Sequence, residues 1–285
     1  MPCPAPRRGP DPIAPARTFR LLWHEVTVGT ADDATDAALA GAVPAAEHPF
    51  DATRRQRYDV TRNPAGYAVA EEGDEAAVAM TPQAVCDAIL ARCFRRAVEL
   101  ASLKGWVRVR AALLDLDGSR VLLVGPSGVG KTVLSLRLAL GGAVFQGDDS
   151  VLLHQGSTFA VPCLPIIRPG AEELLPNFAG ALAPGWLAGG PARVDPCTAL
   201  EAPWRLRIAR VDHVVVLERS GHGAICVAST PAHVLPDLAG ALMPVTESRP
   251  VMLRALTAML SGARCHRLSV GDPRETERAL RRAAC

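Results

Sequence analysis

Residues 125–132 have the types and spacing of a phosphate-binding loop. They read Gly125-Pro126-Ser127-Gly128-Val129-Gly130-Lys131-Thr132, which fits G-x-x-x-x-G-K-[ST]. The glycines let backbone N–H groups turn toward phosphate oxygens, Lys131 can reach the β- and γ-phosphates, and Thr132 can offer its hydroxyl to Mg²⁺. An apolar run precedes the motif and a helical pattern comes after it, which is the context that the motif requires. We therefore expect all eight residues to bind a ligand with a triphosphate group together with Mg²⁺.

Two adjacent carboxylates lie downstream of this loop in the sequence. The predicted helix Thr132–Leu140 stops at Gly141-Gly142, and a short strand from Ala143 ends at Asp148 and Asp149. Because neighbouring strand residues point to opposite sides, one carboxylate can face Mg²⁺ while the other faces an incoming acceptor. The alternative is a pair of solvated turn acids, since Asp is a common turn residue.

These motifs give the chain a resemblance to a known family. The glycine motif, the helix and Asp148-Asp149-Ser150-Val151 are similar to the catalytic domain of HPr kinase/phosphorylase and related serine kinases, which share a core with phosphoenolpyruvate carboxykinase. Val107–Leu114 occupies the place of a family strand, and Val161–Arg168 resembles the segment that comes after the aspartates. The likeness covers roughly residues 105 to 270.

The resemblance implies an α/β fold and a role for each site residue. Lys131 would contact the phosphates, Thr132 and Asp149 would bind Mg²⁺, and Asp148 would be the general base for the acceptor hydroxyl. The opposite order of the two aspartates fits the same spacing. Arg168 would stabilise the transferring phosphoryl group or hold an anionic acceptor, because a guanidinium suits both tasks; a basic residue at a strand end is the simpler interpretation.

The chain departs from the family at Arg110, where the family usually has a His. A His titrates near neutral pH and an Arg does not, so a reverse, phosphorolytic reaction is in more doubt than the forward kinase reaction. Arg110 as a surface strand residue paired with an acid is the alternative.

Two further segments have competing interpretations. Val211–Arg219 could be the Walker B strand of an ordinary P-loop ATPase, with Glu218 activating water. The alternative is a buried strand that ends in a charged residue, as buried strands often do. The Gly- and Pro-rich stretch Ala181–Pro203 stands where the family has a mobile segment over the site, and disorder explains its composition equally well.

Composition sets the outer limits on function. The 285 residues are 49% hydrophobic and 21% charged, with a net charge of +2 and charges of both signs interspersed. This composition favours a soluble globular protein of one to two domains and gives no broad basic face for nucleic acid or an anionic membrane. No apolar run reaches the ~18 residues of a membrane span, and the start of the chain lacks a secretory pattern, so we expect a cytoplasmic location. The eight scattered cysteines have no C-x-x-C spacing and indicate reduced thiols.

The chain divides into three predicted parts. Residues 1–17 are a loose Pro- and Arg-rich tail, and residues 18–104 form a small α+β lobe. That lobe has strands at Phe19–Val28 and Gly66–Ala70 and a long helix that opens at Thr81-Pro82. Residues 105–285 form a P-loop kinase core of the HPr kinase/phosphoenolpyruvate carboxykinase type, ending in a charged helix, Pro273–Ala284.

The resulting prediction is a kinase that transfers the γ-phosphoryl group of ATP to a serine hydroxyl of a protein or peptide. Relatives implied by the resemblance include kinases that modify lasso-peptide precursors. A small-molecule kinase, or a nucleotide-binding switch without phosphotransfer, would use the same phosphate-binding residues. The family's hexameric members make a homo-oligomer compatible with the resemblance.

Overall fold

The computed structural model describes residues 16–43, 46–47, 49–72, 74–175, 192–219 and 223–284. The chain forms two compact units, one of Met1–Val43 and Ala52–Phe94 (the small unit) and one of Pro44–Asp51 and Arg95–Cys285 (the large unit). Most of the predicted tail lies outside the described residues, and its last two residues begin the first strand. In the part of the chain that is described, no helix is long and apolar enough to span a membrane.

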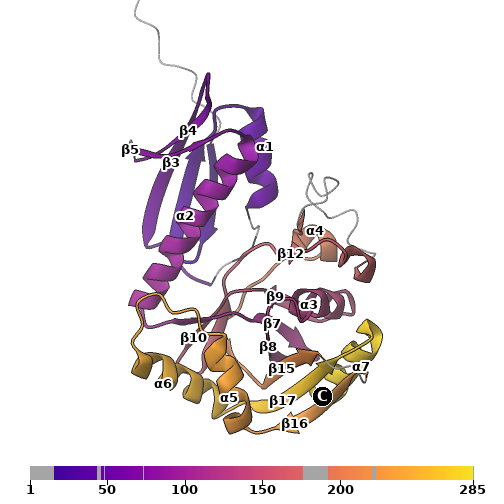
Figure 1. The fold of residues 1–285 in the computed structure, drawn as a ribbon. Helices are drawn as coiled ribbons and strands as arrows, with labels where there is room; N and C mark the ends of the chain where they lie inside the picture. Colours follow the sequence, from indigo (N-terminus) through magenta and orange to yellow (C-terminus); the bar gives the residue numbers. More distant parts are fainter. Residues whose placement is uncertain are drawn as a thin grey trace, which may run out of the picture. The chain divides into compact units, whose positions relative to one another are not determined.

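The small unit is a five-stranded sheet with two helices, ordered β1-β2-β3-β4-β5 (Figure 1). Alternate residues such as Val26, Tyr58 and Val69 are buried on one face. The prediction of one strand over Phe19–Val28 is wrong, because Leu22 adopts a positive φ of 53° and turns the chain into a hairpin. The elements are β1 (Ala16–Leu21), β2 (His24–Gly29), α1 (Asp33–Ala42), β3 (Arg54–Asn63), β4 (Gly66–Glu71), β5 (Asp74–Ala79) and the first part of α2 (Pro82–Leu103), whose residues from Arg95 on belong to the large unit.

The large unit contains the glycine motif and both aspartates. Its first half comprises β6 (Val107–Val109), β7 (Ala112–Leu116), β8 (Ser119–Val124), α3 (Lys131–Leu140), β9 (Val144–Gly147), β10 (Val151–His154), β11 (Ser157–Ala160), β12 (Ile166–Ile167) and the 3₁₀ turn η1 (Glu172–Leu174). Its second half comprises β13 (Ala192–Arg193), α4 (Pro196–Leu200), β14 (Ala209–Arg210), β15 (His213–Arg219), β16 (Ile225–Ser229), α5 (Pro231–Gly240), α6 (Arg249–Leu260), β17 (Arg264–Val270) and α7 (Pro273–Ala284).

A six-stranded sheet with the order β16-β17-β15-β8-β7-β9 forms the centre of the large unit (Figure 1). Side chains on β15 alternate between its faces: Val214 and Val216 pack in the cluster with α5 and α6, whereas Val215 and Leu217 pack in the cluster with α3 and α7. Both faces are therefore covered, as expected for strands that read as continuous apolar runs. Together with its helices, this sheet makes the large unit a mixed α/β fold.

Strand β15 lies parallel to β8, with Val216 opposite Val124. The carboxyl ends of the two strands consequently lie at the same edge of the sheet. The glycine motif begins directly after Val124 at this edge, and Arg219 is the last residue of β15.

The predicted strand Val107–Leu114 is broken in two. β6 joins a second sheet, ordered β14-β11-β10-β6, while β7 belongs to the six-stranded sheet. At the break, the N–H of Arg110 donates to the carbonyl oxygen of Ala241 at 2.8 Å instead of to a neighbouring strand. The break places Arg110 between the two sheets.

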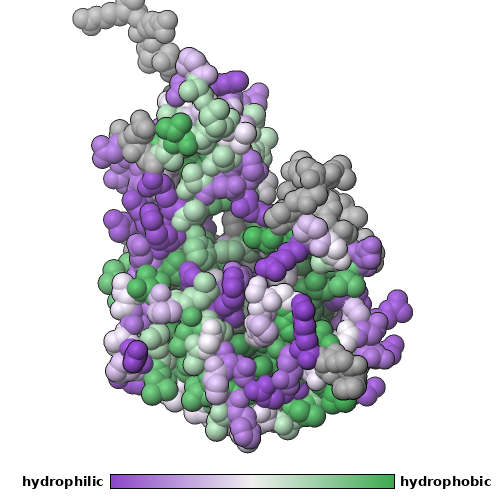
Figure 2. Space-filling view, viewed as in Figure 1, coloured by the Kyte–Doolittle hydropathy of each residue, from purple (hydrophilic) through white to green (hydrophobic). Residues whose placement is uncertain are grey.

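Several predicted elements are confirmed. Helix α3 comes directly after the glycine motif and stops at Gly141, α2 begins at Pro82, and α7 has the predicted bounds. Proline suits the first turn of α2 because its missing N–H would have no helical partner there. On the face of the large unit that Figure 2 shows, hydrophilic and hydrophobic residues are interspersed, as the mixed charges of the sequence predict.

Candidate active site

The glycine loop, residues 125–132, connects β8 to α3. Gly125 has a φ of 150°, and a Cβ atom there would meet the Leu217 carbonyl oxygen at 2.6 Å, so no side chain fits. Gly130 is the N-cap of α3 in the left-handed region (φ 108°) and makes no side-chain cap. The first N–H groups of α3 therefore remain available to an anion, toward which the helix dipole also points.

Lys131 lies inside this loop. Its Nζ donates to the carbonyl oxygens of Gly125 at 2.8 Å and Pro126 at 3.1 Å, and the residue is buried. Burial lowers the pKa of Lys131, and the nearby Asp148 carboxylate opposes that shift. A phosphate oxygen would give the ammonium a stronger, charged acceptor than the two carbonyls.

Asp148 is buried against Thr132. The Thr132 hydroxyl donates to Asp148 Oδ2 at 2.5 Å, and Asp148 is only 5% exposed. Burial raises the pKa of Asp148, while the hydrogen bond from Thr132 works in the opposite direction. The Thr132 hydroxyl and the Asp148 carboxylate thus lie together at the first turn of α3, whereas the sequence led us to expect Asp149 beside Thr132.

Asp149 has a different environment. Its φ is 62°, and the N–H of Ser150 donates across it to the Asp148 carbonyl at 2.8 Å, which closes a tight three-residue turn. This turn directs the Asp149 side chain away from Asp148, leaving it 62% exposed and paired with Arg110 Nε at 2.8 Å. The left-handed backbone at Asp149 is one that Asp adopts more readily than most residues.

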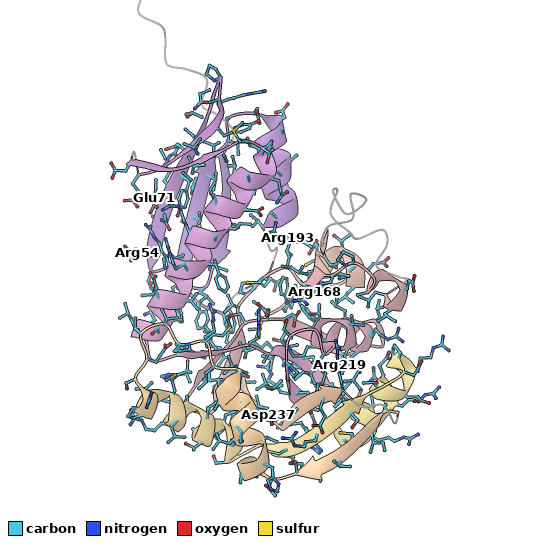
Figure 3. The ribbon with its side chains drawn as sticks, in the orientation of Figure 1. Arg54, Glu71, Arg168, Arg193, Arg219 and Asp237 are labelled. Carbon is cyan, nitrogen blue, oxygen red and sulfur yellow. The ribbon has the colours of Figure 1, made fainter. Side chains whose placement is uncertain are left out.

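Arg168 and Arg219 reach the tip of the glycine loop from different elements (Figure 3). Arg168 comes directly after β12 and donates from Nη2 to the Ser127 hydroxyl at 3.1 Å. Arg219 ends β15 and donates from Nη2 to the Gly128 carbonyl at 2.9 Å. The structure thus brings Arg168 to the loop, as expected, and adds Arg219. The sequence signal for Arg219 was its position at the end of β15, two residues after the apolar run Val214–Leu217.

These residues line one cavity of about 690 Å³. Its walls combine the charged groups above with apolar side chains such as Val133, Leu134, Ile167 and Val270. Cys163 also lines it, but burial raises the pKa of its thiol to about 12, so the thiol stays protonated and is not an activated nucleophile. A largely apolar cleft with a few convergent polar groups is typical of a small-molecule or cofactor site.

The sequence also suggested Glu218 as a catalytic acid and Ala181–Pro203 as a lid over the site. Glu218, the rival catalytic acid, pairs with Arg267 at 3.0 Å and is absent from the described lining of the cavity. Of the predicted lid Ala181–Pro203, residues 181–191 lie outside the described part of the chain; the described remainder forms β13 and α4.

The donor set fits a magnesium-bound triphosphate. Mg²⁺ in nucleotide sites usually takes one or two protein oxygens and completes its shell with water and phosphate. Thr132 and Asp148 could supply those oxygens, and the described residues contain no group of three or more His, Cys, Asp or Glu side chains that would indicate a metal site built from protein alone.

Comparisons with known proteins add little to this geometry. No protein-family description and no curated protein matches the sequence. Among solved structures, the chain is similar to the Hpr(Ser) kinase/phosphatase from Coxiella burnetii, with 15% identity and a TM-score of 0.33 over 62% of this chain and 89% of that one.

Proposed function

We propose that the protein is a kinase that transfers the γ-phosphoryl group of ATP, with Mg²⁺, to a hydroxyl group. The observation that carries this proposal is the separation of two adjacent carboxylates at one cavity. Asp148 is buried against the loop threonine, and Asp149 is exposed and held by Arg110. Phosphoryl transfer needs a metal-binding group beside the phosphates and a second group facing the acceptor.

We assign Mg²⁺ binding to Asp148 and Thr132. The sequence had led us to expect Asp149 as the metal ligand and Asp148 as the general base. Asp148 touches Thr132, the residue that the glycine motif reserves for Mg²⁺, whereas Asp149 turns away from it. Bound Mg²⁺ would supply charge neutralisation between the β- and γ-phosphates. The raised pKa of the buried Asp148 is consistent with a carboxylate that a cation would stabilise in its ionised form.

Asp149 is then the general base. Its carboxylate accepts the proton of the acceptor hydroxyl as the new oxygen–phosphorus bond forms and the bond to the ADP oxygen breaks. Arg110 holds the carboxylate in place through the 2.8 Å contact. Arg110 can do this without titrating near neutral pH, unlike a His.

We further propose a serine of a protein or peptide as the acceptor. The side chain of Asp149 is 62% exposed, so a hydroxyl carried on a chain can approach it without the whole acceptor entering the cavity. A buried base would restrict the enzyme to acceptors small enough to enter.

The test is Asp149→Asn, which keeps the size of the side chain and tolerates the left-handed backbone but cannot accept the proton. We would incubate wild type and variant with γ-labelled ATP, Mg²⁺ and desalted or whole extract of the source cells. We expect label on a protein or peptide, a fall in transfer of about 10²-fold or more with the variant, and an ATP affinity within about threefold of wild type.

Asp117→Asn is the matched control. Asp117 is also exposed, also left-handed (φ 49°) and also paired with an arginine, but it lies outside the described cavity lining. Its transfer rate should equal that of wild type. Unchanged transfer by Asp149→Asn would show that Asp149 is not the general base. Label found only on small molecules would indicate a metabolite kinase. Label found only in free phosphate would indicate an ATPase.

A further inference from the structure

Two guanidinium groups converge on Gly128 at the tip of the glycine loop. A Cβ atom at Gly128 would lie 3.7 Å from Arg168 Nη1 and 3.7 Å from Arg219 Nη2, so both guanidinium groups lie close to this residue. They arrive from elements far apart in sequence, the segment after β12 and the end of β15. The parallel register of β15 and β8 is what delivers Arg219 to this edge.

Neither arginine has a carboxylate partner among the described residues, whereas the other two arginines of the cavity lining do. Arg110 is paired with Asp149, and Arg137 is paired with Glu277. Arg168 contacts only a hydroxyl, and Arg219 only a carbonyl, through one of the five N–H donors of each guanidinium. Both side chains are exposed toward the cavity that they line.

The charges of the cavity indicate which anion these groups serve. With the two ion pairs set aside, Lys131, Arg168 and Arg219 face the single carboxylate of Asp148, which leaves an excess of two positive charges. Magnesium-bound ATP carries about two negative charges. The nucleotide alone therefore balances the cavity, and no anionic group of the acceptor is needed to do so.

We propose that Arg219 is a catalytic residue that acts with Arg168 on the transferring phosphoryl group. This inference rests on the proposed kinase function. In the transfer, the acceptor oxygen–phosphorus bond forms, the bond to the β-phosphate oxygen breaks, and the negative charge spreads over the three equatorial oxygens. Arg219 exchanges its hydrogen bond to the Gly128 carbonyl for a hydrogen bond to one of those oxygens. The acceptor hydroxyl is uncharged and does not need an arginine. Loss of such an arginine is expected to reduce transfer by at least about 10²-fold.

The experiment needs no knowledge of the acceptor. We would measure the binding of ADP with Mg²⁺, and of ADP with Mg²⁺ and aluminium fluoride, which imitates the planar transferring group, by calorimetry. Wild type is expected to bind the fluoride complex more tightly than ADP. Arg219→Gln should weaken the fluoride complex about 10²-fold or more while changing ADP affinity less than about threefold. Arg219→Lys, which keeps the charge but loses the planar fork, should recover part of this loss.

The control and the outcomes separate the two proposals. Arg282→Gln removes an exposed arginine of α7 outside the described cavity lining and should leave both affinities unchanged. Equal weakening of both complexes by Arg219→Gln would mean that Arg219 only stabilises the glycine loop. Unchanged affinities would mean that it neither stabilises the loop nor contacts the phosphoryl group. Either result would overturn the role of Arg219 but not the proposed kinase function. A wild-type protein that binds neither complex would overturn the proposed function, and the role of Arg219 with it.

Discussion

At the scale of single residues, one backbone angle separates two chemically identical side chains. Asp148 and Asp149 differ because the left-handed turn at Asp149 sends its side chain toward Arg110, while Asp148 stays against Thr132. An extended strand would also have sent the two carboxylates to opposite sides, as the sequence suggested. After the turn, Asp148 is buried and Asp149 is exposed, and this difference is the basis of the roles proposed above.

The metal assignment gives a prediction about magnesium. Thr132→Ala and Asp148→Asn should each raise the Mg²⁺ concentration needed for half-maximal ATP binding by about tenfold or more, because each removes one oxygen of the pair. The double variant should lose less than the product of the two effects, since the residues contact each other. Titration of ATP binding with Mg²⁺ would measure this. If Asp149→Asn raised the requirement instead, the metal would lie on the other carboxylate.

At the scale of elements, a buried polar cluster fixes the hairpin that leads into the glycine loop. Asp115 on β7 receives Arg120 Nε from β8 at 2.8 Å, Gln146 Nε2 from β9 at 3.0 Å and Arg207 Nη2 at 2.6 Å. The side chain of Arg120 is only 2% exposed, so its charge depends on Asp115 for compensation. The cluster links β7, β8, β9 and the segment before β14 near the start of β8, opposite the end from which the glycine loop leaves.

Removal of this carboxylate should be costly. Asp115→Asn leaves the Arg120 guanidinium buried without its counter-charge, and we expect the free energy of unfolding of the large unit to fall by about 3–5 kcal/mol. Asp117→Asn, two residues away, breaks a half-exposed ion pair with Arg281, and loss of that pair should cost about 0–1 kcal/mol. Urea unfolding of both variants would measure the difference. Similar losses in the two would show that Arg120 finds compensation elsewhere.

At the scale of the whole large unit, two buried histidines link stability to pH. His213 on β15 and His266 on β17 stack at 5.2 Å between ring centroids, with Nδ1 of the first 3.0 Å from Nε2 of the second. Burial lowers the pKa of both, and the cationic Arg264 adds to the effect. His213 is the first residue of β15, whereas the glycine loop meets this sheet at the carboxyl end of the neighbouring strand β8.

The sign of the pH dependence comes from those shifts. Unfolded histidines titrate near about 6.5, and the folded pair resists protonation, so its stability is complete above that pH and is lost as the pH falls below it. The pair contributes to the slope of the free energy of unfolding against pH, by at most about 1.4 kcal/mol per pH unit for each proton taken up. Urea unfolding between about pH 7.5 and 5 should give a shallower slope for His266→Gln than for wild type. His233→Gln, which removes an exposed histidine, should keep the wild-type slope, and equal slopes for all three proteins would contradict this origin.

Local patterns in the sequence determined much of this unit. The glycine motif, the helix after it, the strand before it and the charged closing helix can be derived from spacing, glycine stops and apolar runs within short windows. Such signals do not depend on distant parts of the chain. They predicted the glycine loop, Lys131, Thr132 and the pair of aspartates as neighbours in one site.

Only the tertiary structure decided the environment of each group. The break of the predicted strand at Arg110 and the position of Arg219 beside Gly128 depend on strand pairing between distant segments. Burial of Asp148 and exposure of Asp149 depend on which side chains surround them after folding, and no local pattern encodes that. The sequence by itself therefore determined which groups come together around the glycine loop, while packing decided which carboxylate is buried against Thr132 and which is exposed beside Arg110.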